Sequence, residues 1–190
     1  MGCPVDFTSL QVSYACGEIA SGGLKTVYLA DKSELEALGA ISVDASGAAT
    51  ITKTGASLQA DLVAAGNDLL NLGFNNKDGF SNFTDVKTVN ADGSASVVPT
   101  ITMEFLRMDA LKRAALEEIA TPGAEIVAFV ETAAGTKHVV GLDFGLYAGT
   151  VDGASGAART DKNRYQLTLV GEENVLAYTL TQTEWDKLVA

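Results

Sequence analysis

The stretch that decides the fold is Val97–Leu106, with the sequence Val-Val-Pro-Thr-Ile-Thr-Met-Glu-Phe-Leu. Apolar and polar side chains alternate along it, so that each kind occupies its own face of an extended chain: Ile101, Met103 and Phe105 on one, Thr100, Thr102 and Glu104 on the other. A period of two is typical of a strand with one buried and one exposed face. The segment therefore predicts a half-buried strand.

An amphipathic helix follows this strand. Asp109 is a suitable N-cap for the segment up to Ala120, in which Leu111, Ala115 and Ile119 share one helix face. The helix is expected to end before Thr121-Pro122-Gly123, because proline and glycine disfavour its continuation. Two further strands are expected after it, joined by the loop Thr132–Thr136: Ala124–Glu131 and Lys137–Leu142.

The remaining segments favour more strands. Three segments are predicted strands: Leu24–Ala30, Tyr165–Leu169 and Val175–Thr181. Between the first two, Ser33 and Glu36 resemble a capping box on a short helical turn that stops at Gly39. Two runs, Ala49–Thr54 and Ser57–Val63, fit strands or their connections. The predicted fold is mainly β (α+β), a β-sandwich or barrel with one flanking α-helix. We expect a single domain over 1–190, with an irregular N-terminal arm (1–21), loops and a hairpin between Gly66 and Gly93, and a long loop between Gly149 and Asn163.

Composition excludes several classes of protein. Hydrophobic residues make up 47% and charged residues 19% of the 190, which is too apolar for a disordered chain. The formal net charge of -11 has the wrong sign for tight nucleic-acid binding. No apolar run approaches the roughly 20 residues that span a bilayer, and we expect a soluble protein. The N-terminus lacks the features of a secretory signal, and Asp6 stands where the myristoylation pattern has Ser or Thr. Cys3 and Cys16 are expected to be reduced thiols, although a bridge stays open.

No residue pattern predicts catalysis, cofactor binding or a metal site. His138 lies in a predicted strand without a nucleophile nearby in the sequence, and Asp143-Phe144-Gly145 lacks the other kinase motifs. The Asp-Gly segments near Asp44, Asp92 and Asp152 lack the ligand spacing of a calcium loop. The acidic pairs Glu117-Glu118 and Glu172-Glu173 are adjacent in sequence, so their side chains are expected to point apart into solvent. We therefore expect a protein that is not an enzyme and that needs no cofactor.

The order of these segments resembles a family. A Gly-Gly-Leu-Lys-Thr-Val-Tyr-Leu-Ala strand (22–30) precedes Ile-Thr-Met-Glu-Phe (101–105), the helix and the hairpin Glu125–Val140. Gly-Leu-Asp-Phe-Gly (141–145), Ser155-Gly156, Asp-Lys-Asn (161–163) and Tyr-Gln-Leu-Thr-Leu-Val-Gly-Glu-Glu (165–173) follow. Together they resemble the tail-tube, or major tail, proteins of tailed bacteriophages, particularly those of Bacteroidetes-type hosts. The resemblance is best over Val98–Thr181 and weakest over Ala40–Gly93.

The resemblance implies a virion structural protein of the viral tail, assembled in the cytoplasm of the host bacterium. Such a protomer forms homo-oligomeric, hexameric rings that stack into a hollow conduit for DNA ejection, and it contacts other tail or connector proteins. In a ring, each subunit's strands would extend the neighbour's sheet and remove exposed edges. The acidic balance suggests the hypothesis that a negative lumen repels DNA phosphates. The segments Gly66–Gly93 and Gly149–Asn163 are candidates for contacts between rings.

Other functions stay open at this point. The poorly matched middle leaves room for a head-to-tail connector or a tail terminator, which would form a single ring. A carbohydrate- or receptor-binding β-sandwich could stack ligands on Trp185 or on the five tyrosines, although Trp185 better fits the anchor of a C-terminal helix. A hydrolase is the least supported alternative.

Overall fold

The computed structural model describes residues 22–76, 81–158 and 161–189. The N-terminal arm (1–21), with Cys3 and Cys16, lies outside these residues. The described part of the chain contains eleven strands and four helices, in this order: β1 (Leu24–Asp31), α1 (Lys32–Ala37), β2 (Ile41–Val43), β3 (Ala49–Ile51), α2 (Leu58–Ala64), β4 (Leu70–Asn71), β5 (Asn82–Val89), β6 (Ala95–Leu106), α3 (Ala110–Ile119), β7 (Ile126–Thr132), β8 (Lys137–Val140), β9 (Leu146–Ala154), β10 (Arg164–Gly171), β11 (Tyr178–Thr179) and α4 (Gln182–Asp186).

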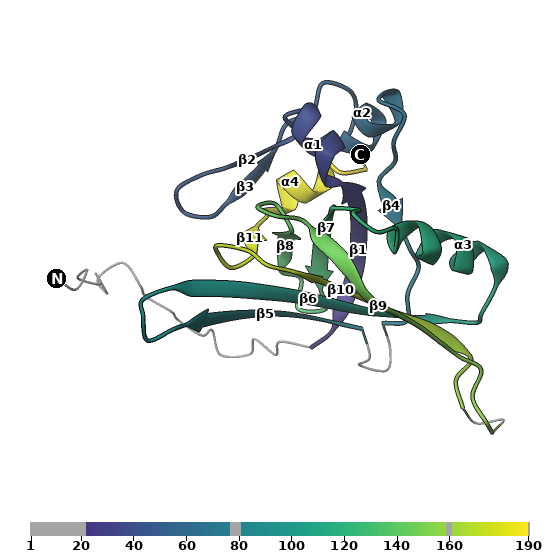
Figure 1. Cartoon of the computed structure of the whole chain (residues 1–190). Helices are drawn as coiled ribbons and strands as arrows, with labels where there is room; N and C mark the ends of the chain where they lie inside the picture. Colours follow the sequence, from purple (N-terminus) through teal and green to yellow (C-terminus); the bar gives the residue numbers. More distant parts are fainter. Residues whose placement is uncertain (1–21, 77–80, 159–160, 190) are drawn as a thin grey trace.

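The architecture is mainly antiparallel β, as predicted, with a large sheet, a small β2–β3 sheet and helices around them. The large sheet has two parts. One, here called the four-stranded sheet, has the order β5-β6-β10-β9, and the other, the five-stranded sheet, has the order β4-β1-β7-β8-β11. A single residue pair, Ile126 with Leu146, joins them between β7 and β9. Figure 1 shows β5 and β6 along the bottom of the view, with β1, β7 and β8 rising above them.

A tight turn carries the chain across this junction. Gly141 has a φ of 86°, and a Cβ atom there would lie 2.6 Å from the Ile126 carbonyl oxygen. Only glycine combines this backbone conformation with so close an approach. The Gly141–Gly145 segment therefore brings the chain from β8 in the five-stranded sheet to β9 in the four-stranded sheet.

Two clusters of buried side chains cover the two faces of the five-stranded sheet. In β7, Ile126, Ala128 and Val130 belong to the cluster shared with the four-stranded sheet and α3, whereas Val127 and Phe129 belong to the cluster under α1, α2, α4 and the β2–β3 hairpin. Both faces of β7 are thus apolar, which explains its continuous hydrophobic sequence.

Several predicted elements are confirmed. Strand β1, the β7–β8 hairpin and β10 lie where the sequence places them, and Ile101, Met103 and Phe105 of β6 are buried. Helix α3 begins after Asp109, whose side chain accepts a hydrogen bond from the Lys112 N–H. Trp185 of α4 is 8% exposed and packs in the cluster under α1 and α2, as expected for an anchor.

Other predictions were wrong. The N-cap of α1 is Asp31, not Ser33. Residues 58–64, for which the sequence left a strand or a connection open, form helix α2, capped by Ser57. The predicted strand Val175–Thr181 is reduced to β11. Where loops and a hairpin were predicted (66–93), β5 is a regular strand that pairs with β6, and within the predicted loop 149–163 most of β9 is a regular strand. These exposed strands are polar or rich in small residues, so their hydrogen bonding to β6 and β10 determines their conformation more than their composition does.

No helix in the described ranges has the length and hydropathy that are needed to cross a bilayer.

Candidate assembly surface

The four-stranded sheet ends on both sides in a strand with a free edge. Strand β5 pairs with β6 along its whole length and with no other strand among the described residues. Strand β9 pairs with β10, and on its other side it meets β7 through Leu146. The outer backbone of β5 and of β9 from Tyr147 to Ala154 thus offers N–H and C=O groups to another strand.

The directions of these two edges are complementary. All pairs in the four-stranded sheet are antiparallel, and the number of strands is even, so β5 and β9 run in opposite directions. When a rotation about an axis roughly parallel to the strands places a second copy beside the first, the β9 of that copy lies antiparallel to the β5 of the first copy. The same contact repeated around an axis closes a ring without leaving an edge unpaired.

The outer face of the four-stranded sheet carries rows of hydroxyl side chains and is here called the hydroxyl-rich face. Thr102 pairs with Thr168, which pairs with Thr150, and Asn82 completes this row across all four strands. A neighbouring row contains Thr84 and Thr100. These residues alternate with the buried Ile101, Met103, Leu167 and Leu169, so they point away from the core.

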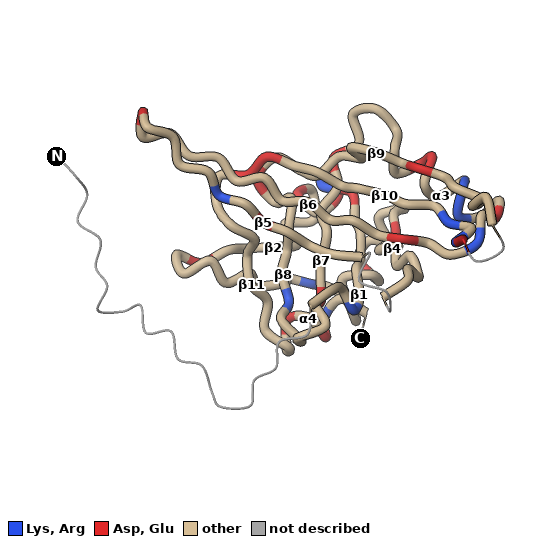
Figure 2. The backbone as a smooth tube through the Cα atoms, turned by 90° about the horizontal axis from the view of Figure 1, so that it is seen from below, with Lys and Arg blue, Asp and Glu red and all other residues tan. Residues whose placement is uncertain are grey.

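Few charges lie on this face. Within the four strands, the outward positions carry Glu104, Asp152 and Arg164 as their charged residues. Figure 2, which views the molecule from below, shows few charged residues (Lys and Arg blue, Asp and Glu red) along most of β5, β6 and β10. The negative charge of the chain is therefore carried mainly by other surfaces.

Glu104 is the exception to the exposed pattern, because its side chain is fully buried although it points outward. Its carboxylate accepts hydrogen bonds from Lys162 Nζ at 2.9 Å, Asn75 Nδ2 at 2.8 Å and Arg164 Nη1 at 3.0 Å. Burial opposes ionisation, but the hydrogen bonds and the charge of Lys162 outweigh it and lower the pKa of Glu104. This cluster ties the segments before β5 and β10 to β6.

We expect Glu104→Gln to destabilise the fold, because it leaves Lys162 and Arg164 without their shared counter-charge. Breaking a buried ion pair costs about 3–5 kcal/mol, and the partial exposure of both cations, 31% and 25%, reduces the expected loss to roughly 1.5–3 kcal/mol in urea unfolding. The matched control is Glu117→Gln, whose exposed pair with Arg113 is worth less than about 1 kcal/mol. Equal losses for the two variants would contradict this account.

A second buried carboxylate is Glu173, which is 7% exposed, so the expectation that its side chain points into solvent was wrong. It accepts hydrogen bonds from the backbone N–H groups of Asp143 (2.9 Å) and Phe144 (3.5 Å) and so holds the turn at the sheet junction. Burial raises its pKa, and the charge of Asp143 adds to the effect. Its neighbour Glu172 is exposed, so these two carboxylates are not paired.

The raised pKa of Glu173 gives a testable pH dependence. Between its ordinary and its folded pKa the native state binds more protons than the unfolded state, so stability falls as the pH rises through this window. Glu173→Gln removes the ionisation and is expected to raise the melting temperature at pH 7.5 relative to the native protein. The advantage should shrink or reverse at pH 4. Glu172→Gln, the exposed control, should show no such dependence, and a pH-independent effect of Glu173→Gln would contradict the assignment.

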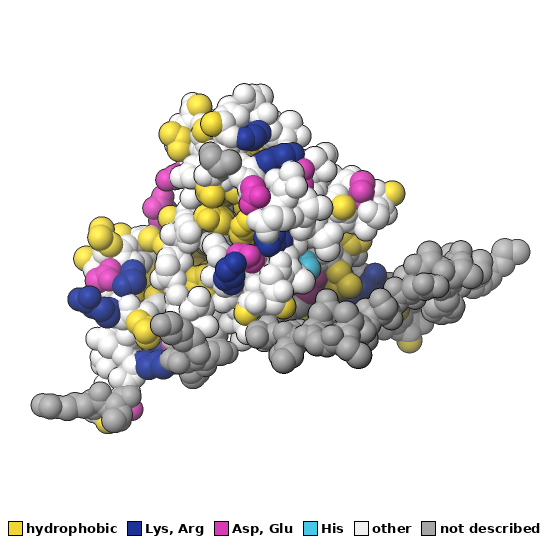
Figure 3. Space-filling model, turned by 180° about the vertical axis from the view of Figure 1, so that it is seen from behind, with side chains coloured by type: hydrophobic (Ala, Val, Ile, Leu, Met, Phe, Trp, Pro, Cys, Tyr) yellow, Lys and Arg dark blue, Asp and Glu magenta, His cyan; other side chains and the backbone are white. Residues whose placement is uncertain are grey.

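The other residues singled out in the sequence do not come together. His138 lies in β8 with its ring 5.9 Å from that of Phe83, and its buried Nδ1 has no hydrogen-bond partner within the described part of the chain. Burial lowers the pKa of His138, and Asp85 partly offsets this. Part of the histidine is visible from behind (Figure 3). Among the described residues, no group of three or more His, Cys, Asp or Glu side chains is placed to hold a metal ion.

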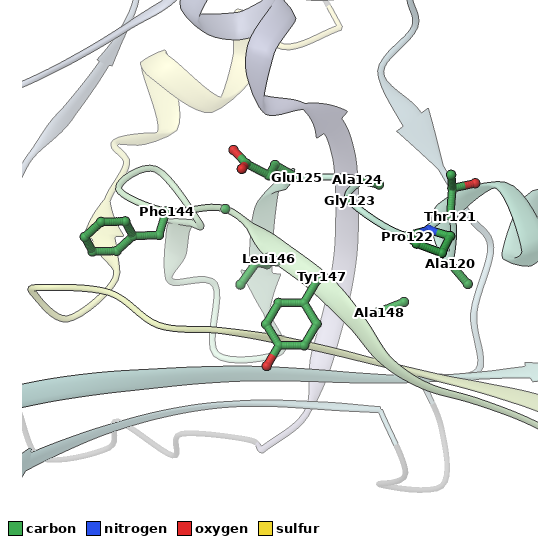
Figure 4. Close-up of a pocket in the computed structure, with 11 residues that line it drawn as sticks. Ala120, Thr121, Pro122, Gly123, Ala124, Glu125, Phe144, Leu146, Tyr147 and Ala148 are labelled. Carbon is green, nitrogen blue, oxygen red and sulfur yellow. The ribbon is translucent and has the colours of Figure 1, made fainter.

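A pocket of about 490 Å³ lies at the sheet junction, between the α3–β7 connection and the start of β9. Phe144 and Tyr147 line it and are 58% and 54% exposed. In Figure 4 the two rings point in different directions, so they do not form one platform for stacking a sugar. Trp185 is buried and does not offer a stacking surface either.

Comparisons with protein-family models, curated proteins and solved structures give no match to this chain.

Proposed function

We propose that this chain is a virion structural protein, the protomer of a phage tail tube, and that it assembles through the edges of its four-stranded sheet. The observation that carries the proposal is the pair of oppositely directed edges in β5 and β9, which no other strand covers in residues 22–76, 81–158 and 161–189, apart from the contact of Leu146 with β7. The resemblance of Val98–Thr181 to tail-tube proteins supports it, because this region contains β9, β10 and most of β6.

The proposal predicts the number of strands and the diameter of the tube wall. Each copy adds four strands, so the six copies that the resemblance implies would form a barrel of about 24 strands. With strands about 4.8 Å apart and tilted by about 35–45°, opposite backbones would lie roughly 45–52 Å apart. The outer face of the four-stranded sheet would line the lumen of this barrel.

The hydroxyl-rich face supports passage of DNA without retention. Its outward positions contain one cation, Arg164, and that side chain is bonded to Glu104. Such a lining has few free cations to neutralise phosphates, and phosphate neutralisation is the main source of non-specific affinity for DNA. In this account weak adhesion follows from the scarcity of cations on the face, and it does not require the negative lumen suggested by the composition.

Sedimentation at increasing protein concentration tests the proposal. A tube protomer should form particles whose sedimentation coefficient rises without a limiting size, because stacked rings expose new ends. A head-to-tail connector or tail terminator should instead stop at one ring of fixed size. A monomer at all concentrations would contradict assembly of the purified protein through its own edges.

A further inference from the structure

A second open cavity lies on the other side of the molecule from the hydroxyl-rich face. It is a groove of about 340 Å³ between α3 and the edge formed by β1 and β4. Figure 1 shows α3 beside β4, above the level of β5 and β6. Its floor is apolar and comes from β1, β4, α3, the α3–β7 connection and the start of β7: Leu29, Ala30, Leu70, Ala115, Ile119, Ala124 and Ile126.

The rim of this groove is acidic. Asp31, Asp68 and Glu118 line it, and its lining residues include no Lys or Arg. Asp31 and Asp68 accept hydrogen bonds from nearby backbone N–H groups, whereas the Glu118 carboxylate makes no ion pair with any residue in the described ranges. These carboxylates add up to a negative potential over an apolar floor.

Two cations on the elements around the groove are paired with other carboxylates. Lys32 pairs with Glu36 and Glu125, and Arg113 of α3 pairs with Glu117 on the helix surface. The charge of the rim is therefore not neutralised from within the described part of the chain. A ligand that brings both apolar side chains and cations would cover the floor and balance the rim.

We propose that this groove, between α3 and the β1–β4 edge, binds a segment of a partner protein in which Lys or Arg residues flank apolar anchors. An apolar anchor would occupy the floor over Ala115 and Leu70, and the flanking cations would face Glu118 and Asp68. The chain's own residues 1–21 do not suit the groove, because they contain Asp6 and Glu18 but no Lys or Arg. The inference does not depend on tube formation, because the groove and the hydroxyl-rich face are separate surfaces.

The probe is a short fluorescent peptide in which lysines flank a group of leucines. The control peptide is identical except that glutamate replaces each lysine. At low salt, anisotropy titrations are expected to show at least about tenfold tighter binding of the lysine peptide. Glu118→Lys should weaken that binding about fivefold or more. Ala115→Trp fills the groove from a partly exposed helix position and should weaken it more than about tenfold.

One control variant and the outcomes that would overturn the proposal make the test decisive. Glu172→Lys changes the net charge equally but lies after β10, away from the groove, so it should leave affinity within about twofold. Equal binding of both peptides, no binding at millimolar lysine peptide, or equal effects of Glu172→Lys and Glu118→Lys would each overturn the proposal. If Ala115→Trp abolished self-association in sedimentation while lysine-peptide binding stayed unchanged, the groove would be a contact between copies and the proposal would fail.

Discussion

A proline in β5 is expected to abolish assembly while leaving the protomer folded, provided that it replaces a residue whose N–H points out of the sheet. In an antiparallel edge strand, successive residues direct their N–H groups alternately to the partner strand and to the free edge. Val86 and Lys87 are neighbours in β5, so one of Val86→Pro and Lys87→Pro removes an outward N–H and the other removes a bond to β6. The variant that removes the outward N–H should raise the concentration needed for assembly at least about tenfold. Each contact between copies in a ring would then lose one hydrogen bond and the regular strand pairing around it.

The variant that removes a hydrogen bond to β6 should have a free energy of unfolding lower by about 1–3 kcal/mol, because a carbonyl group of β6 is left without its hydrogen-bond donor. Val86→Thr and Lys87→Gln keep the backbone N–H and are the matched controls, which should assemble like the native chain. Circular dichroism and urea unfolding measure the fold, and sedimentation measures the assembly. If both proline variants folded and assembled at native concentrations, the β5 edge would not be the contact.

A lysine on the hydroxyl-rich face is expected to make assembled tubes retain DNA. Thr102→Lys and Thr168→Lys each add one cation per protomer in the central row of the four-stranded sheet. A ring that presents about six cations to a duplex should bind it with a steep salt dependence, losing about 10³-fold in affinity between roughly 50 and 200 mM salt. Native tubes should show no retention at either concentration in co-sedimentation with linear duplex DNA.

The control places the same charge elsewhere. Val63→Lys adds a cation on α2, one of the helices that cover the five-stranded sheet, where the native side chain is 57% exposed. It should leave DNA binding at the native level, because α2 lies outside the proposed lumen. Retention by Val63→Lys that equals retention by Thr102→Lys would show that the four-stranded sheet does not line the channel.

The sequence predicts elements well where local pattern and burial agree. The alternation around Ile101 and Met103 predicts one buried face of β6, and the Asp109 cap with its apolar helix face predicts α3. In β6 the alternating pattern corresponds directly to the side that the core covers. In α3 the position of the helix was predicted, but the buried side chains are Leu116 and Ile119, and Leu111 of the predicted apolar face is 85% exposed.

Prediction fails where partners far away in the chain decide the outcome. Gly149–Gly153 resembles a loop in composition, but hydrogen bonding to β10 makes it part of β9. Glu104 lies on the polar face of an alternating strand, and it is covered by Lys162 and Arg164, which follow it by 58 and 60 residues. The candidate surface itself, two opposite free edges, depends on the strand order and could not be predicted from any single segment.

The most direct test of the central claim is electron microscopy of the purified protein at increasing concentration. The account predicts hollow stacked rings, with a continuous wall in which β5 of each copy pairs antiparallel with β9 of the next. Dispersed monomers at every concentration, or rings joined through another surface with β5 and β9 left unpaired, would contradict it.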